Sequence, residues 1–121
     1  MKTVFIVDDS DTNRMAAKTA LDEIYKTYAI PSAQRMFKLL DKITPDIILL
    51  DIRMPEMDGF EALEVLKQNE NSKNIPVIFL TAKNDPETEQ LSHRAGASDF
   101  IIKPFFAPDL IERIEKHLTN N

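Results

Sequence analysis

Short apolar runs recur along the chain and alternate with longer, more polar segments. Four of them are bounded by charged or turn-forming residues and occupy residues 4–7, 47–50, 77–80 and 100–102. Continuous apolar runs of this length are typical of strands that are buried on both faces of a sheet. A weaker run at residues 28–30 predicts a fifth strand.

The segments between these runs carry apolar residues at helical spacing. Three such sets predict one helix face each: Ala17, Ala20, Leu21 and Ile24; Phe60, Leu63 and Leu66; Leu110, Ile114 and Leu118. A short helix is predicted at residues 35–40, before Pro45, and Pro108 suits the start of the last helix. Strand and helix thus alternate five times, which predicts an α/β fold: a doubly wound parallel sheet of five strands with helices on both faces.

The helix predicted at residues 87–94 differs from the others, because Leu91 is its only large aliphatic residue. A helix with so little apolar surface is held weakly by the core. We expect that it is mobile or that its outer face meets a partner; the alternative is an ordinary solvated helix.

Composition narrows the classes of protein. A length of 121 residues fits a single domain that spans residues 1–121. The chain has no cysteine, which excludes disulfides, cysteine–zinc sites and thiol catalysis. Its net charge is −5, so no direct nucleic-acid contact is expected. No apolar run is long enough for a membrane span, and the first residues show no signal-peptide pattern.

Polar side chains follow four of the predicted strands: Asp8 and Asp9 the first, Asp51 the third, Thr81 the fourth and Lys103 the fifth. We expect the first, third and fourth strands in the middle of the sheet, with the fifth beside them. The carboxyl ends of parallel strands share one edge, where binding sites form. Three carboxylates so close together repel one another, and a single lysine does not neutralise them. The all-oxygen set favours a hard divalent cation such as Mg²⁺.

This set of groups suits phosphoryl transfer. Asp51 is the best candidate nucleophile, because it ends the most apolar of the central strands, and carboxylates form acyl phosphates. Thr81 and Lys103 can bind phosphoryl oxygens. Each residue taken alone has a simpler interpretation: the acid pair as a polar loop with a helix cap, Asp51 as a turn residue, Lys103 as a solvated cation. The combination is more specific, because each group sits at the same end of a different strand.

At this point the sequence resembles the receiver domains of bacterial response regulators, which have a flavodoxin-like fold. The resemblance runs from Val4 to about Leu118 and rests on the matching segments 7–10, 45–59, 76–82 and 96–105. It implies that Asp51 accepts a phosphoryl group from a histidine kinase. It also implies Mg²⁺ as cofactor, with Asp9, Asp51 and the backbone carbonyl of Arg53 as direct ligands and Asp8 acting mainly through metal-bound water.

The resemblance assigns roles to further residues. Thr81 and Lys103 contact the phosphoryl group, and the Lys103–Pro104 peptide bond is cis. Phe100 matches the aromatic switch position, where it replaces the tyrosine often found there and lacks the hydroxyl. Thr81 and Phe100 move together and change the surface formed by the fourth helix, fifth strand and fifth helix. Arg53 and Lys83 match positions that tune phosphoryl lifetime, and we hypothesise that they screen or contact the acyl phosphate.

Two other classes share parts of this pattern. A haloacid-dehalogenase-like phosphohydrolase also uses an aspartyl-phosphate intermediate, but its D-x-D motif follows the first strand and it carries a cap insertion. A flavin-binding flavodoxin needs a phosphate loop without acids after the first strand, whereas Asp8, Asp9 and Asp11 stand there. A receiver that binds partners without phosphorylation is a third alternative, and the complete acid set argues against it.

The receiver resemblance also implies partners. These are a sensor histidine kinase or phosphotransfer protein, a downstream effector domain or protein, and a second copy of the chain after phosphorylation. A phospho-acceptor of this kind is not an independent enzyme, and a cytoplasmic location is expected. The segments 75–83 and 103–118 look most like receivers attached to cyclic-dinucleotide enzymes.

Overall fold

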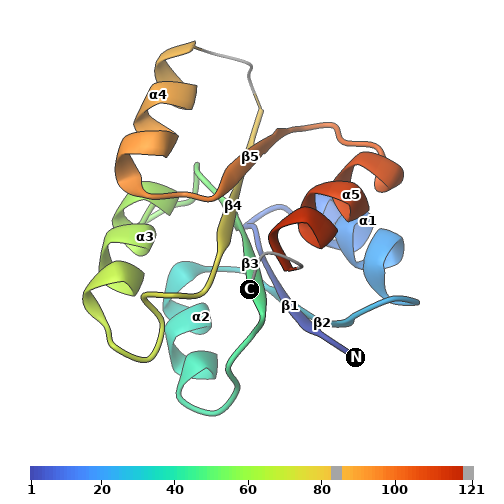
Figure 1. Cartoon of the computed structure of the whole chain (residues 1–121), viewed down its shortest axis with the longest axis horizontal. Helices are drawn as coiled ribbons and strands as arrows, with labels where there is room; N and C mark the ends of the chain where they lie inside the picture. The colour runs from blue at the N-terminus through green and yellow to red at the C-terminus, as the bar shows by residue number, and fades with distance from the viewer. Residues whose placement is uncertain (83–85, 119–121) are drawn as a thin grey trace.

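The computed structural model describes residues 1–82 and 86–118. Within them the elements alternate as the apolar pattern predicts: β1 (Thr3–Val7), α1 (Asp11–Leu21), β2 (Lys26–Ile30), α2 (Ala33–Leu40), β3 (Ile47–Asp51), α3 (Gly59–Gln68), β4 (Val77–Thr81), α4 (Pro86–Ala95), β5 (Asp99–Ile102) and α5 (Ala107–Leu118). The strands form one parallel sheet in the order β2-β1-β3-β4-β5 (Figure 1). The predicted doubly wound, flavodoxin-like fold is confirmed, including the central position of β1, β3 and β4.

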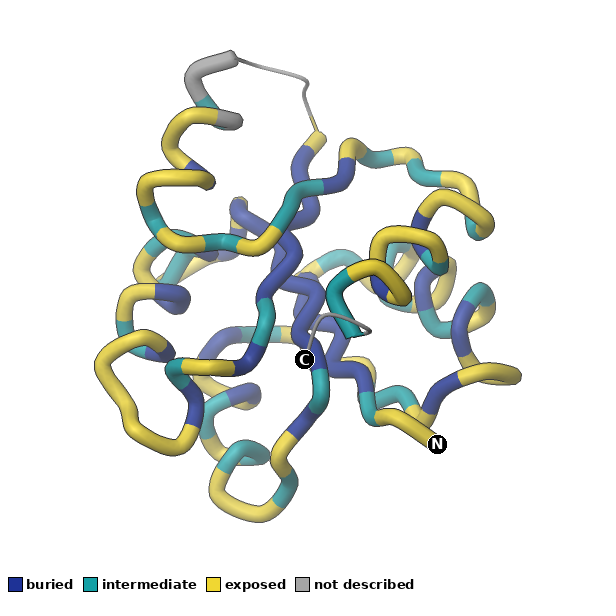
Figure 2. Tube along the Cα trace, viewed as in Figure 1, coloured by how far each residue is buried: buried dark blue, intermediate teal, exposed yellow. Residues whose placement is uncertain are grey.

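Helices α1 and α5 cover one face of the sheet, and α2, α3 and α4 cover the other (Figure 1). The strands between these layers are the most buried part of the chain (Figure 2). All five residues of β3 and of β4 are buried. Successive side chains of a strand point to opposite faces, so Phe5 and Val7 pack toward α2 and α3 while Val4 and Ile6 pack toward α1 and α5. A strand covered on both sides needs apolar residues at every position, which explains the continuous runs.

The first helix is shorter than its spacing predicts. It ends at Leu21, and Ile24 lies in the following turn with 42% of its surface exposed. The backbone N–H groups of Ile24 and Tyr25 both donate to the carbonyl of Leu21, and this turn brings Tyr25 inward instead. Tyr25 is 3% exposed, and its hydroxyl donates to Glu115 of α5. The inclusion of Ile24 in the buried face is therefore wrong.

Helix α4 carries the weak apolar face that the sequence indicates. Leu91 is 43% exposed, and the residue turned toward the protein interior is Ser92, whose hydroxyl donates to the Thr88 carbonyl at 2.8 Å. Gly96 follows the helix with a φ of 92°, a conformation that L side chains rarely adopt. The expectation that α4 is mobile or meets a partner stays a prediction. Among the described residues, no helix combines the length and apolar character needed to cross a membrane.

Candidate phosphoryl-transfer site

The three predicted carboxylates meet at the carboxyl edge of the sheet. Asp51 is the last residue of β3, and Asp8 and Asp9 follow β1 directly. One oxygen from each of the three side chains lies within 4.8 Å of the other two. Asp8 is 0% exposed and Asp51 is 4% exposed, whereas Asp9 is exposed to solvent. The geometry that the site requires is therefore present.

Lys103 inserts its ammonium group between two of these acids. Its Nζ lies 3.1 Å from Oδ1 of Asp51 and 3.2 Å from Oδ2 of Asp8, and its side chain is 13% exposed. Burial opposes the charged form of Lys103, but the hydrogen bonds and charges of Asp51 and Asp8 outweigh this and raise its pKa. The Lys103–Pro104 peptide bond is cis, as the family resemblance implies.

Within the cluster, Asp51 has a raised pKa. Its pKa is raised to about 6: burial is the largest cause, the charge of Asp8 adds to the rise, and Lys103 opposes both without cancelling them. A pKa this high means that the carboxylates remain under-compensated when only the ammonium group faces them. A hard divalent cation would supply the missing charge, and the carboxylates of Asp8, Asp9 and Asp51 are the oxygen ligands such a cation prefers. The donor set therefore fits Mg²⁺.

The acids line a small cavity of about 150 Å³ that also reaches the ends of β4 and β5. Thr81, 7% exposed, lines this cavity, and so do Arg53 and Lys103. Arg53 itself is exposed. Lys83, which the sequence pairs with Arg53 as a tuning residue, lies outside the described residues.

Two polar residues of the cavity wall, Ser10 and Asn13, were not recognised from the sequence. Ser10 is the N-cap of α1, and its hydroxyl accepts the backbone N–H of Asn13 at 3.3 Å. Its own backbone N–H donates to Oδ1 of Asp8 at 2.9 Å. Asn13, in the first turn of α1, lines the same cavity. The signal was available: a helix that begins directly after an acid pair at a strand end turns its first residues toward the same rim.

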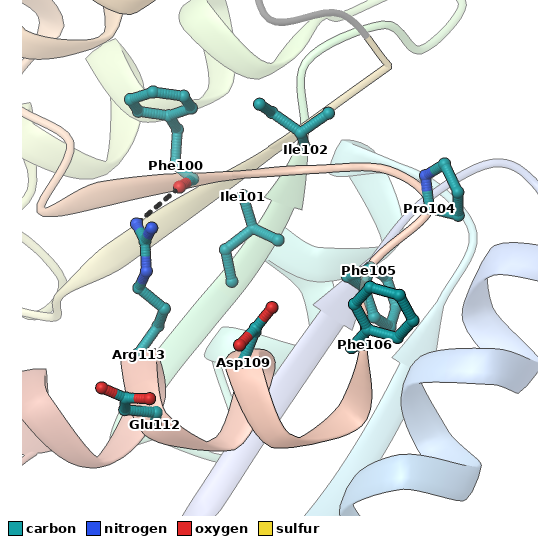
Figure 3. Close-up of a pocket in the computed structure, with 9 residues that line it drawn as sticks. All are labelled: Phe100, Ile101, Ile102, Pro104, Phe105, Phe106, Asp109, Glu112 and Arg113. Atoms are coloured by element: carbon teal, nitrogen blue, oxygen red, sulfur yellow. Dashed lines mark hydrogen bonds between the residues drawn. The ribbon is translucent and has the colours of Figure 1, made fainter.

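Phe100 lies outside this cavity, on the neighbouring part of the sheet. It pairs with Phe79 of β4, as Ile102 pairs with Thr81, so Thr81 and Phe100 share one face of the sheet. Phe100 is half-buried and packs against the core layer beneath α2, α3 and α4. Figure 3 shows its ring on the side of β5 opposite to α5, while Ile101 points toward α5. The Nη1 of Arg113 donates to the Phe100 carbonyl at 3.1 Å.

Comparison with known proteins agrees with this geometry. The family model of the response regulator receiver domain matches residues 4–115. The chain is 33% identical to the polar-differentiation response regulator DivK of Brucella ovis, over 97% of this chain and 96% of that protein. It is 42% identical, over 98% of its length, to a probable cyclic di-GMP phosphodiesterase of Vibrio cholerae, of which it spans 27%.

A solved structure shows the same fold. The receiver domain of the sensor histidine kinase PA1611 from Pseudomonas aeruginosa aligns with a TM-score of 0.89 at 24% identity, over 98% of each chain. That domain has a magnesium ion coordinated in its active site cleft. The family match also favours a receiver over the haloacid-dehalogenase-like alternative, in keeping with a candidate nucleophile that ends β3 rather than β1. The chain therefore belongs to the response regulator receiver domains, the phospho-acceptor modules of two-component signalling.

Proposed function

We propose that Asp51 is the phospho-acceptor of this receiver domain. The observation that carries the proposal is the convergence of Asp8, Asp9 and Asp51, two of which, Asp8 and Asp51, also contact Lys103. A carboxylate oxygen of Asp51 attacks the phosphorus of the donor and forms an acyl phosphate. The phosphorus–nitrogen bond of the donor phosphohistidine breaks, and its electron pair returns to the imidazole. With its pKa at about 6, Asp51 is mostly ionised at pH 7 and can act as this nucleophile.

The residues around Asp51 divide the remaining tasks. Asp9, Asp51 and the backbone carbonyl of Arg53 would hold Mg²⁺, and Asp8 would act mainly through metal-bound water. When bound, Mg²⁺ offsets the negative charge of the acids and of the phosphoryl oxygens. Lys103 holds its ammonium group beside Asp51 before transfer and then faces a phosphoryl oxygen. The hydroxyl of Thr81, at the end of β4, donates to another phosphoryl oxygen.

Phosphorylation is tested with the small donor acetyl phosphate and Mg²⁺, with intact mass as the readout. The wild type should gain the mass of one phosphoryl group, and Asp51→Asn should gain none. Asp41→Asn removes an exposed acid at the end of α2, far from the site, and should behave like the wild type. Chelation of Mg²⁺ should abolish the mass gain of the wild type and of Asp41→Asn. A gain that persists in Asp51→Asn would place the nucleophile elsewhere.

We also propose how the phosphoryl group changes the outer surface. Thr81 moves toward the phosphoryl oxygen, and Phe100, on the same sheet face, turns inward into the space that Thr81 leaves. The surface formed by α4, β5 and α5 changes as a result. A hollow of about 700 Å³ lies on this surface between β5 and α5, and Phe106 beside it is 76% exposed (Figure 3).

The partners proposed for this domain follow from its family and its exposed groups. A sensor histidine kinase or phosphotransfer protein supplies the phosphoryl group. A downstream effector domain or protein, or a second phosphorylated copy of the chain, binds the surface of α4, β5 and α5, where Leu91 and Phe106 are exposed. We place the domain in the cytoplasm, where the kinase domains that use ATP reside.

A further inference from the structure

Arg14, in the first turn of α1, turns its guanidinium group back toward the loop that carries the acid pair. Its Nη1 donates to the backbone carbonyl of Asp8 at 2.7 Å, and its Nη2 donates to the carboxylate of Asp11. The Arg14 side chain is 17% exposed, whereas that of Asp11 is 94% exposed. A planar guanidinium group can bridge two acceptors with its two terminal nitrogens. The single ammonium nitrogen of a lysine cannot reproduce this arrangement.

The carbonyl that Arg14 holds belongs to the peptide unit that joins Asp8 to Asp9. The rest of Asp8 is fixed independently: its N–H donates to the Ile30 carbonyl at 3.1 Å, and its carboxylate accepts from Ser10 and Lys103. The carboxylate of Asp9 has no hydrogen bond or ion pair within the described part of the chain. The position of its Cβ, from which the carboxylate reaches the other two acids, is therefore set by the backbone, and Arg14 holds one peptide plane of that backbone.

We infer that Arg14 is a positioning residue for the metal site: by holding the Asp8–Asp9 peptide, it aims the Asp9 carboxylate at the oxygens of Asp8 and Asp51. This inference rests on the proposed function, because it takes the three carboxylates to be the site of Mg²⁺. Residues that orient metal ligands commonly change metal affinity by about 10-fold to 100-fold when they are replaced. The hydrogen bonds of Arg14 go to the Asp8 carbonyl and to Asp11 rather than to the three carboxylates, so Arg14 acts through the peptide.

The positive charge of Arg14 and its positioning role have opposite effects on Mg²⁺ affinity. A guanidinium group close to the acids repels a divalent cation, so on charge alone the removal of Arg14 would strengthen Mg²⁺ binding. On positioning, its removal weakens binding, because the Asp9 carboxylate loses its fixed direction. The two effects predict opposite signs for Arg14→Ala. They also differ for Arg14→Lys, which keeps the charge and loses the bridge.

Isothermal titration of the metal-free protein with MgCl₂ tests the inference, with thermal unfolding of the same samples as a measure of folding. Both Arg14→Ala and Arg14→Lys should bind Mg²⁺ about tenfold more weakly than the wild type, without a matching loss of unfolding temperature. Lys18→Ala is the matched control. It removes a cation one turn later in α1, where Lys18 contacts Asp22 and Thr27 and not the acid pair, and it should leave the affinity unchanged.

Tighter binding by Arg14→Ala together with wild-type binding by Arg14→Lys would overturn the inference in favour of simple repulsion. Unchanged affinity in both variants would also overturn it. If Arg14→Ala does not fold, Arg14→Lys carries the test, since it keeps the charge and loses the bridge; an affinity about tenfold weaker is expected, and an unchanged one contradicts the inference. A wild type that binds no Mg²⁺ would instead remove the proposed function itself.

Discussion

At the scale of single residues, the pKa of Asp51 determines the pH above which its carboxylate is ionised and can act as a nucleophile. Burial is the largest cause of its raised pKa, and the charge of Asp8 is the next. The neighbouring ammonium group of Lys103, 3.1 Å away, opposes this rise without reversing it. In the metal-free protein, the ionised form of Asp51 is therefore disfavoured relative to the unfolded chain, and a bound cation would remove part of that penalty.

The pH dependence of stability follows from this shift. The folded-state pKa of Asp51, about 6, exceeds the ordinary value of 3.8, so the folded protein holds the proton more tightly than the unfolded chain. The contribution of the Asp51 proton to the free energy of unfolding is fully present below about pH 4 and is lost as the pH rises through 6. In the absence of metal, we expect the free energy of unfolding of Asp51→Asn to rise relative to that of the wild type by on the order of 1 to 2 kcal/mol between pH 4 and pH 7.

Urea unfolding at a series of pH values measures this difference. Asp41→Asn, which removes an exposed carboxyl group just after α2, is the control and should follow the wild type across the same range. Parallel profiles for Asp51→Asn and the wild type would show that the pKa of Asp51 is not raised in the folded protein.

At the scale of elements, the start of α3 is tightly docked against the end of β3. Asp58 and Glu61 form a capping box, with reciprocal hydrogen bonds of 2.9 Å and 3.1 Å between side chain and backbone. The N–H of Gly59 donates to the Ile52 carbonyl at 2.8 Å. A Cβ atom at Gly59 would lie 2.6 Å from the backbone oxygen of Asp51, so only glycine permits this approach. The helix thereby supports the backbone of the proposed phospho-acceptor.

Gly59→Ala tests this docking. Glycine-to-alanine changes inside helices usually stabilise by roughly 0.5 to 1 kcal/mol. Here we expect a loss of about 1 to 3 kcal/mol, because the added methyl group meets backbone atoms of β3 that cannot turn aside. Denaturant unfolding measures the change, and phosphorylation by acetyl phosphate should slow as the Asp51 backbone shifts. Gln68→Ala, at the exposed end of the same helix, should change stability by less than about 0.5 kcal/mol; a stabilised Gly59→Ala would refute the close approach.

At the scale of the whole molecule, the helices next to β5 are attached with very different strength. Helix α5 packs Leu110 and Ile114, each 0% exposed, onto the sheet. It is also tied to β5 through Asp99, which accepts from Arg113 at 2.7 Å and lies 3.0 Å from His117. Helix α4 offers Leu91, which is 43% exposed, and the buried hydroxyl of Ser92. The surface proposed to signal thus joins a firmly anchored helix to a weakly anchored one.

Amide hydrogen exchange should separate the two helices. We expect the amides of α4 to exchange through local opening at a lower free energy than those of α5, because few buried apolar contacts oppose that opening. Leu91→Ala should cost less than about 1 kcal/mol of stability, and Ile114→Ala about 2 to 5 kcal/mol. Equal protection of both helices, or a large loss in Leu91→Ala, would contradict the difference in anchoring.

Several parts of the site could be predicted before the fold was known, and others could not. Asp8, Asp9, Asp51, Thr81 and Lys103 were found because each directly follows or ends an apolar run. Arg14 was not found as a site residue, since nothing in its local pattern separates it from an ordinary surface residue of a helix. Ser10 and Asn13 were missed although their place directly after the acid pair points to the same edge of the sheet. The apolar spacing also predicts that Ile24 is buried, whereas the structure buries Tyr25 instead. The reason is that the helix ends three residues earlier than its apolar spacing suggests.

The amino-acid sequence by itself determined the order of the elements, the parallel sheet and the edge at which the acids gather. It could do so because a strand covered on both faces must be apolar throughout, and polar residues can follow only where it ends. The tertiary structure alone decided how close the three carboxylates come, that Lys103 lies between Asp8 and Asp51, and that Arg14 holds the peptide between the paired acids. Those distances join residues from different strands and loops, and only the packing of the whole sheet brings them together.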